Sequence, residues 1–292
     1  MIRVFLIVGG AIVAMAALLA VVTFAVSEAR FRDVERPPPF TAEIPSDTAS
    51  IARGERIART RGCFGCHGQK LEGKDFSDQW DWVERGIAPN LALVARNHSP
   101  AALEAAIRHG IDTDGRATYS MPSYNWVHLT DDEVAELIAF LRSAPVTEID
   151  LPSPRLGWPA RWRIAFGGEP TGPELVKQVP PLKHADSEDP AMRRGERLAM
   201  TMCNECHGFD LRGAAVAGPP TPDLAMIAGY PLEDFTRLMR ECVAMGGRRD
   251  LGLMSLVCPD RFYALTNDEI ADLHSFLGTL YLEPAPENVP WR

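Results

Sequence analysis

The first apolar pattern along the chain is a run of 23 residues, Val4 to Val26, that contains no charged side chain. About 20 consecutive apolar residues let a helix cross the hydrocarbon core of a bilayer. The run therefore predicts one transmembrane helix. The alternative is a cleaved secretory signal ending near Ser27, but the apolar core of such a signal is typically about 7–15 residues long. Both interpretations take the rest of the chain out of the cytoplasm.

Beyond this run, the same pattern of polar and apolar positions occurs twice. RGERIARTRGCFGCHG, from Arg53, aligns with RGERLAMTMCNECHG, from Arg194, and LTDDEVAELIAFL, from Leu129, aligns with LTNDEIADLHSFL, from Leu265. In the second pair a threonine is followed three positions later by glutamate, which is the capping-box pattern of a helix start. Apolar residues then recur at helical spacing. The chain therefore contains one module twice, and each copy closes with a helix.

The repeat divides the chain into four parts. We place a membrane anchor with a proline-rich spacer at 1–44, module one at 45–146, an interdomain linker at 147–184, and module two with a C-terminal tail at 185–292. Neither module has a run of alternating strand pattern, which predicts an all-α fold.

The linker is rich in proline, which predicts a segment without regular structure. Within it, GWPARWRIAFGG carries Trp158, Trp162 and Phe166 beside two arginines. A short amphipathic segment at a membrane surface or against a partner is one interpretation. Packing between the two modules is the favoured one.

The net negative charge of the chain limits the kinds of macromolecule that it can bind. The 292 residues include 39 acidic and 30 basic side chains, a formal net charge of -9, which argues against binding to nucleic-acid phosphate. Module one has a net charge of -3 and module two a net charge of -7. We therefore expect module two to meet a basic protein partner, with association faster at low salt.

Each module also contains one Cys-x-x-Cys-His motif, formed by Cys63, Cys66 and His67 in module one and by Cys203, Cys206 and His207 in module two. At this spacing two thiols attach to the vinyl groups of one haem, and the adjacent histidine presents its imidazole to the iron. A zinc site would need the two cysteine pairs to converge, and a thioredoxin-like motif would need a βαβ context. The motifs therefore predict two covalently attached haem c groups, with the two histidines as iron ligands.

A transferring haem usually takes a methionine thioether as its second protein ligand. The candidate region of module one contains Gly110, Gly115-Arg116, Met121-Pro122-Ser123 and the segment from His128 to Glu133. These residues resemble the methionine half of class I c-type cytochromes, and in particular the modules of multihaem cytochrome subunits of membrane-bound dehydrogenases. The resemblance covers both modules and implies two tandem class I cytochrome c domains, with Met121 as the second iron ligand in module one.

Module two departs from this pattern because Ser255 stands where proline is expected. Met254 is the preferred iron ligand there, with Met245 in reserve. Cys242 and Cys258 bracket Met254 and are the cysteines left after four bind haem. Outside the cytoplasm they are expected to form a disulfide; two separate buried thiols are the alternative.

The resemblance also suggests residues around the haems. Related modules hydrogen-bond the histidine ligand through a backbone carbonyl, and Pro89 and Pro222 are the candidates for this role. His128 and His274 are expected to be packing or polar positions. Trp80 and Trp82, in an insertion of module one, are expected to pack locally, with an electron entry point as the alternative.

With histidine and methionine on both irons, no position remains open for a substrate. The sequence therefore predicts outer-sphere electron transfer between a membrane redox complex or dehydrogenase and an acceptor such as a terminal oxidase or soluble cytochrome, with no small-molecule substrate. A dihaem peroxidase is the alternative from the enzyme class, and it requires one iron that can open. A haem-bearing accessory subunit of a respiratory or photosynthetic complex is the third hypothesis.

The expected location follows from the haem chemistry. Arg30, Arg32 and Arg36 follow the apolar run, and a count of basic residues alone would place the modules in the cytoplasm. Haem c attachment in bacteria takes place on the outer face of the membrane, and we give this more weight. The prediction is a single-pass protein of the bacterial inner membrane with both haem modules in the periplasm.

Overall fold

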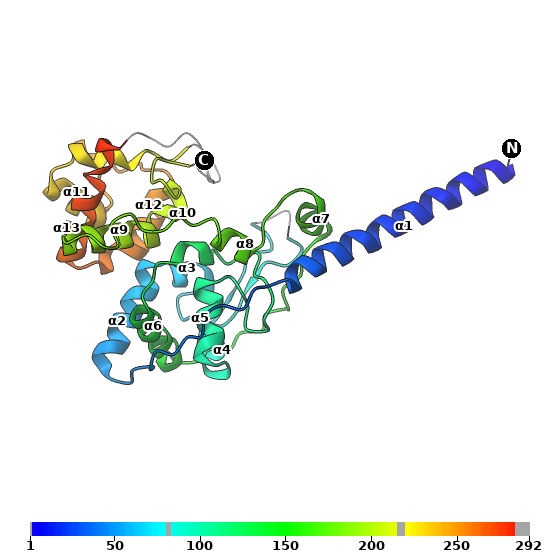
Figure 1. Ribbon diagram of the computed structural model, residues 1–292, viewed down its shortest axis with the longest axis horizontal. Helices are drawn as coiled ribbons and strands as arrows, with labels where there is room; N and C mark the ends of the chain where they lie inside the picture. The colour runs from blue at the N-terminus through cyan, green and yellow to red at the C-terminus, as the bar shows by residue number, and fades with distance from the viewer. Residues whose placement is uncertain (1, 80–82, 215–219, 284–292) are drawn as a thin grey trace.

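One long helix projects from a body of two helical modules (Figure 1). The structure is a computed structural model that describes residues 2–79, 83–214 and 220–283. The projecting helix is α1 (Ile2–Arg32). Within the described residues, extended structure is limited to isolated bridges and one antiparallel pair of two-residue strands, β1 (Lys74–Asp75) and β2 (Ile87–Ala88). The prediction of a helical fold is confirmed.

The two modules follow the same plan: a first helix, a short helix with the Cys-x-x-Cys-His motif, a long irregular region and a closing helix. Module one contains α2 (Thr48–Thr60), α3 (Cys63–His67), α4 (Leu91–Asn97), α5 (Pro100–Arg108), the 3-10 helix η1 (Ser123–Trp126) and α6 (Asp131–Ser143). Module two contains α9 (Pro190–Met202), α10 (Asn204–His207), η2 (Leu224–Gly229), α11 (Leu232–Glu241), η3 (Met245–Gly247), α12 (Leu253–Arg261), η4 (Phe262–Ala264), α13 (Asn267–Leu277) and η5 (Leu280–Leu282).

Within each module, the first and the closing helix cross at a glycine. A Cβ atom on Gly54 of α2 would collide with the carbonyl oxygen of Glu136 in α6, and one on Gly195 of α9 with that of Asp272 in α13. The absence of a side chain therefore lets the two backbones touch. The closing helices begin at the predicted threonines, each with a complete capping box. Side chains of these helix pairs form much of the apolar core of each module, and the Cys-x-x-Cys-His segment packs against this core.

The modules meet through equivalent surfaces. Helix α2 of module one packs on α12 and η4 of module two, while α9 of module two packs on η1 of module one. Arg56 of α2 binds Glu269 of α13 at 2.5 Å, and Arg197 of α9 approaches Glu133 of α6 at 3.5 Å. The two arginines occupy the same position of the repeat, and so do the two glutamates. The interface is therefore reciprocal, as in a dimer with two-fold symmetry.

The prediction that the linker lacks regular structure is wrong. It forms α7 (Trp158–Phe166) and α8 (Gly172–Val176). Pro159 and Pro173 lie in the first turns of these helices, where the missing N–H costs no hydrogen bond. The expectation that this segment packs between the modules is also wrong, because α7 packs against α1.

The structure differs from the predicted spacer as well. The end of α1 rests directly on module one, where the backbone N–H of Ala117 donates to the carbonyl oxygen of Phe31 at 2.8 Å. After the prolines, the half-buried side chains of Phe40 and Ile44 pack against the module-one core. The proline segment, predicted as a stiff spacer between the lipid and module one, therefore runs along module one.

Candidate haem-binding sites

Both motif histidines are oriented by a backbone carbonyl. The Nδ1 atom of His67 lies 2.8 Å from the carbonyl oxygen of Pro89, and the Nδ1 atom of His207 lies 2.8 Å from that of Pro222. A carbonyl can only accept, so Nδ1 carries the proton and Nε2 keeps its lone pair for a metal. Burial lowers the pKa of both histidines, against the effect of these hydrogen bonds. The neutral imidazole, which is the form that ligates iron, is therefore favoured.

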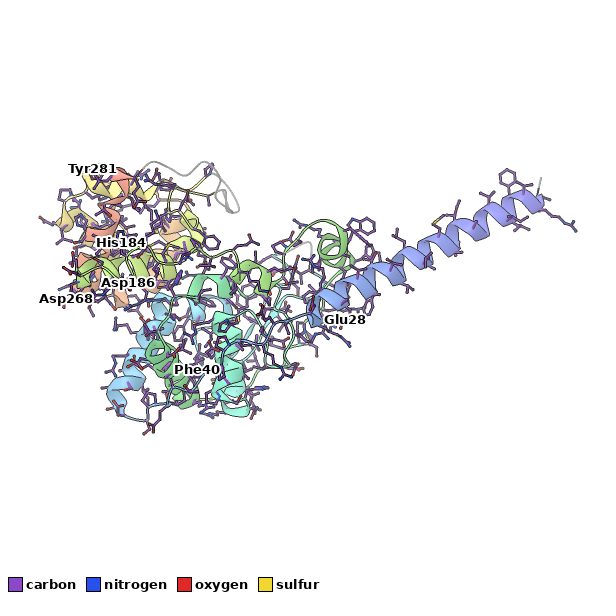
Figure 2. All side chains as sticks on the ribbon, viewed as in Figure 1. Glu28, Phe40, His184, Asp186, Asp268 and Tyr281 are labelled. Atoms are coloured by element: carbon purple, nitrogen blue, oxygen red, sulfur yellow. A yellow bond between two sulfur atoms is a disulfide. The ribbon has the colours of Figure 1, made fainter. Side chains whose placement is uncertain are left out.

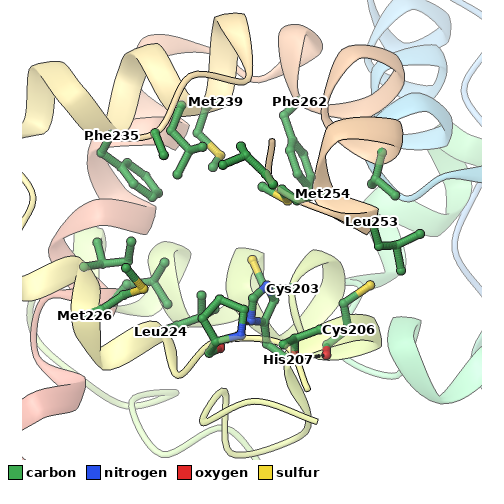
Figure 3. Close-up of a pocket in the computed structure, with 18 of the residues that line it drawn as sticks. Cys203, Cys206, His207, Leu224, Met226, Phe235, Met239, Leu253, Met254 and Phe262 are labelled. Carbon is green, nitrogen blue, oxygen red and sulfur yellow. Dashed lines mark hydrogen bonds between the residues drawn. The ribbon is translucent and has the colours of Figure 1, made fainter. Parts of the chain in front are cut away.

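Module two encloses a cavity of about 630 Å³ behind its motif. In Figure 3, Cys203, Cys206 and His207 lie on one wall of this cavity, and Met254 lies on the opposite wall. The walls between them are largely apolar, with contributions from Leu224, Phe235, Met239, Phe262, Leu273 and Leu277. The volume is in the usual range for a ligand site, about 300–1,000 Å³. Thiols on one side, a thioether on the other and apolar walls between them fit a covalently attached haem.

Met254 and Met245 differ clearly in their position. Met254 lines the cavity, whereas 46% of the surface of Met245 is exposed to solvent. The structure therefore favours Met254 over the reserve candidate. Helix α12, which carries Met254, starts after Gly252, a residue with positive φ.

In module one, Met121 and Cys63 pack against the same apolar core. Met121 precedes the 3-10 helix η1, and the loop is tied down by Ser123, whose hydroxyl donates to the carbonyl oxygen of Ala106 at 2.7 Å. Ser123 is completely buried. Module one therefore has the same set of groups as module two, with the methionine on a fixed loop.

Cys242 and Cys258 are joined by a disulfide in the structure, with Cα atoms 5.8 Å apart. The bond links the end of α11 to α12 and closes the loop that contains Met254. Cys258 is almost fully buried against the module-two core. The covalent bond therefore restrains the backbone on both sides of the candidate ligand.

The four motif cysteines are poor thiolates. Burial raises the pKa of Cys63 and Cys203 to about 12 and the pKa of Cys206 to about 11. Zinc binding and nucleophilic catalysis both require the thiolate. The surroundings of these cysteines therefore suit thioether attachment better than either of those uses.

Two arginines near the motifs were not predicted as site residues from the sequence. Arg261 of module two binds Glu205 at 2.6 Å, and its guanidinium lies against Gly62, the residue before Cys63. Its charge acts on both Cys66 and Cys206. Arg261 therefore lies between the two attachment segments.

Arg61 has the reciprocal position. It is a module-one residue, only 4% exposed, and its charge acts on Cys203 of module two. Burial lowers the pKa of Arg61, and Glu133 opposes this effect. Module one has two residues between Thr60 and Cys63 where module two has one between Thr201 and Cys203, and this insertion was a signal available in the sequence. No such signal marked Arg261, whose role depends on the contact between modules.

Tyr124 adds a third link across the interface. It follows Met121 by three residues, and its ring packs edge-on against Phe209 of module two with centroids 5.9 Å apart. Burial, together with the nearby charge of Glu205, raises its pKa to about 12. The methionine loop of module one therefore reaches the attachment segment of module two.

The remaining histidine candidates have structural partners. The Nε2 atom of His128 bonds the carbonyl oxygen of Pro180 at 2.9 Å, and that of His274 bonds the carbonyl oxygen of Tyr230 at 2.8 Å. These contacts fit the expected packing role. Trp80 and Trp82 lie outside the described residues.

A helical module in which a Cys-x-x-Cys-His helix and a methionine line one apolar interior is typical of a cytochrome c. The comparison with protein families agrees, because residues 51–145 match the Cytochrome c family model. This part of the chain is a cytochrome c domain.

Known proteins with similar sequences carry cytochrome names. The chain is 26% identical over 217 residues to the alcohol dehydrogenase (quinone) cytochrome c subunit of Gluconacetobacter polyoxogenes, covering 66% of this chain and 44% of the relative. It is 28% identical over 203 residues to the fructose dehydrogenase cytochrome subunit of Gluconobacter japonicus, covering 65% and 40%. It is also 28% identical over 212 residues to a diheme cytochrome c-type protein of Cereibacter sphaeroides, covering 66% and 69%. The chain thus spans less than half the length of the two dehydrogenase subunits.

Proposed function

We propose that the chain is a membrane-anchored dihaem cytochrome c that passes electrons between a membrane dehydrogenase, or another membrane redox complex, and a downstream acceptor such as a terminal oxidase or a soluble cytochrome. Haem, when bound, supplies an iron that takes up and releases one electron at a time. His67 with Met121, and His207 with Met254, are the proposed ligand pairs. Electron transfer is the function that the cytochrome c domain itself supports.

The observation that carries the two-haem proposal is the placement of both attachment segments at one interface. Arg261 touches Gly62 of one module while it binds Glu205 of the other. Around this point α2 of module one packs on α12 and η4 of module two. Arg61 is buried and Arg261, with a side chain 16% exposed, is partly buried. Their positive charges favour an added electron on either side, because a nearby positive charge stabilises negative charge in a medium of low dielectric constant. In this proposal, an electron crosses between the modules without a diffusing carrier.

The donor proposal rests on the relatives. Their names describe cytochrome subunits of dehydrogenases for alcohol, fructose and gluconate. The anchor proposal rests on α1, which is long and apolar enough to cross a membrane and whose most apolar 18-residue window has no buried residue. The matching periplasmic partner is basic, because module two has a net charge of -7.

The test uses the full chain expressed with haem attachment machinery. Intact mass is expected to exceed that of the polypeptide by two haem groups. Met121→Ala and Met254→Ala are each expected to remove the spectral signature of methionine ligation from one haem, and the exposed Met245→Ala is the matched control that keeps both. A single haem in the mass, or an unchanged spectrum for Met254→Ala, would contradict the proposal.

A further inference from the structure

Helix α7 carries an exposed aromatic stripe that the proposed electron transfer does not use. Trp158, Trp162 and Phe166 follow each other at intervals of four residues, so they share one face of the helix. They are 46%, 40% and 48% exposed, and the rings of Trp162 and Phe166 pack with centroids 4.9 Å apart. Three large aromatic side chains side by side in water are costly, which points to a surface that is covered in the working protein.

The other face of α7 is attached to α1. Ala160 and Ile164 of α7 are fully buried, and so are Thr23 and Ser27 of α1. The two helices pack together along these faces. The aromatic stripe is therefore held in one orientation relative to the axis of α1.

Polar contacts fix the same arrangement. The Nη1 atom of Arg161 donates to the hydroxyl of Ser27 at 2.9 Å, and its guanidinium stacks over the ring of Phe24 at 4.3 Å. From the α1 side, Arg30 donates to the carbonyl oxygen of Ile164 and binds Glu174 at 2.5 Å. The contacts of Arg161 and the bond from Arg30 to Ile164 connect α7 to the C-terminal part of α1, and the Arg30–Glu174 pair connects α8 to it; none of them involves the aromatic stripe.

The position of these contacts along α1 sets their depth. The uncharged run Val4–Val26 is about 34 Å long as a helix, close to the roughly 30 Å of a hydrocarbon core. Phe24, Ser27 and Arg30 therefore lie at the level where α1 leaves the hydrocarbon for the headgroups. Of the elements that pack on α1, α7 extends furthest toward its N-terminal part (Figure 1). Tryptophan and other aromatic rings accumulate at this level in membrane proteins.

We infer that α7 is an interfacial membrane helix, whose Trp158, Trp162 and Phe166 insert among the lipid headgroups of the leaflet that α1 leaves. Phe24 of α1, whose ring lies under the Arg161 guanidinium, is also 52% exposed. Arg163, whose side chain is 52% exposed, pairs with Glu169 at 3.3 Å on the surface of α7, where its guanidinium can also meet anionic headgroups. Together with α1, α7 forms a two-point attachment that fixes the tilt of module one on the bilayer. This inference rests on the proposed membrane anchor.

A spin-label accessibility experiment tests it on the full chain in nanodiscs of phosphatidylcholine and phosphatidylglycerol. Because the haem cysteines are bound and Cys242 is paired with Cys258, an introduced cysteine is the single free thiol. Nitroxides are placed by Phe166→Cys in the stripe, by Ile12→Cys in the middle of α1 and by Asp268→Cys in module two. Figure 2 shows Asp268 at the end of the molecule opposite α1. Each label is measured with oxygen, which concentrates in lipid, and with a water-soluble nickel chelate.

The expected ratio of oxygen to nickel accessibility at position 166 is at least threefold above that at position 268, with position 12 higher still. A high ratio at 12 with equal ratios at 166 and 268 would overturn the inference and leave the stripe to a protein partner. A low ratio at 12 would instead show that the anchor proposal itself fails, and the inference with it. The haems stay oxidised in all samples, so their effect on the nitroxide is the same with and without the added reagent.

Discussion

The disulfide between Cys242 and Cys258 gives the most quantitative prediction. Opening it by reduction, or removing it with Cys242→Ala/Cys258→Ala, frees a loop whose ends are 16 residues apart in sequence. The chain-entropy relation for a loop of this length gives about 3 kcal/mol of stabilisation at 25 °C. We expect the free energy of unfolding of module two to fall by about this amount.

The same loop contains Met254, so the effect should extend to the candidate iron site. A factor of ten in an equilibrium constant corresponds to about 1.4 kcal/mol, so 3 kcal/mol corresponds to about 100-fold. If the whole effect is felt at the loop, an exogenous ligand such as imidazole should displace the methionine of the second haem up to about 100-fold more readily. The first haem, whose Met121 lies in a loop without a disulfide, is the internal control.

Urea denaturation and imidazole titration measure the two effects on the oxidised chain, the reduced chain and the double variant. Reduction keeps both sulfur atoms, whereas the variant also leaves a cavity at the buried Cys258. The reduced chain therefore isolates the contribution of the covalent bond. The expected loss in the free energy of unfolding is about 3 kcal/mol. A loss below about 0.5 kcal/mol on reduction, together with an unchanged imidazole affinity, would refute the reasoning that the disulfide restrains the Met254 loop.

Two further predictions concern the interface and pH. In a double-mutant cycle of Arg56→Ala and Glu269→Gln, we expect a coupling of about 1 kcal/mol in urea unfolding, because the pair is bonded at 2.5 Å and partly buried; additive effects would contradict a cross-module contact. Burial lowers the pKa of His128, against the effects of the Pro180 carbonyl and Glu196. The unfolded state then binds a proton more readily, so His128 should lower stability as pH falls through about 6.5 toward its folded pKa, and His128→Gln should reduce this pH dependence.

Much of the site was predictable from local sequence. The two Cys-x-x-Cys-His motifs and the capping threonines are local patterns, and the structure places two cysteines, a histidine and Met254 around one cavity. The carbonyls of Pro89 and Pro222 accept hydrogen bonds from the motif histidines, the role that the resemblance to class I c-type cytochromes suggested. These features depend only on residues within one module, and their recurrence in the second module made them recognisable in the sequence.

The missed features depend on contacts between distant parts of the chain. Proline density suggested an irregular linker, but proline breaks a helix only beyond its first turn, and Pro159 lies within that turn of α7. The amphipathic pattern of α7 was visible in the sequence, but its packing partner was not. The face of α1 that receives α7 carries Thr23 and Ser27, which lie at the end of the apolar run and did not mark a packing surface. From the sequence alone, Arg261 resembles an ordinary surface arginine. Its position beside Gly62 becomes apparent only in the packed structure of the two modules.

The reciprocal interface bears on the proposed direction of electron flow. Equivalent surfaces meet, so the contact itself gives neither module a fixed role as donor or acceptor. The asymmetry comes from the surroundings: the end of α1 packs on module one, while module two lies beyond it and carries the larger net negative charge (Figure 1). In the proposed membrane arrangement, a partner embedded in the bilayer reaches module one, and a basic partner diffusing in the periplasm reaches module two. Exchange between the modules then connects a carrier confined to two dimensions with one that moves in three.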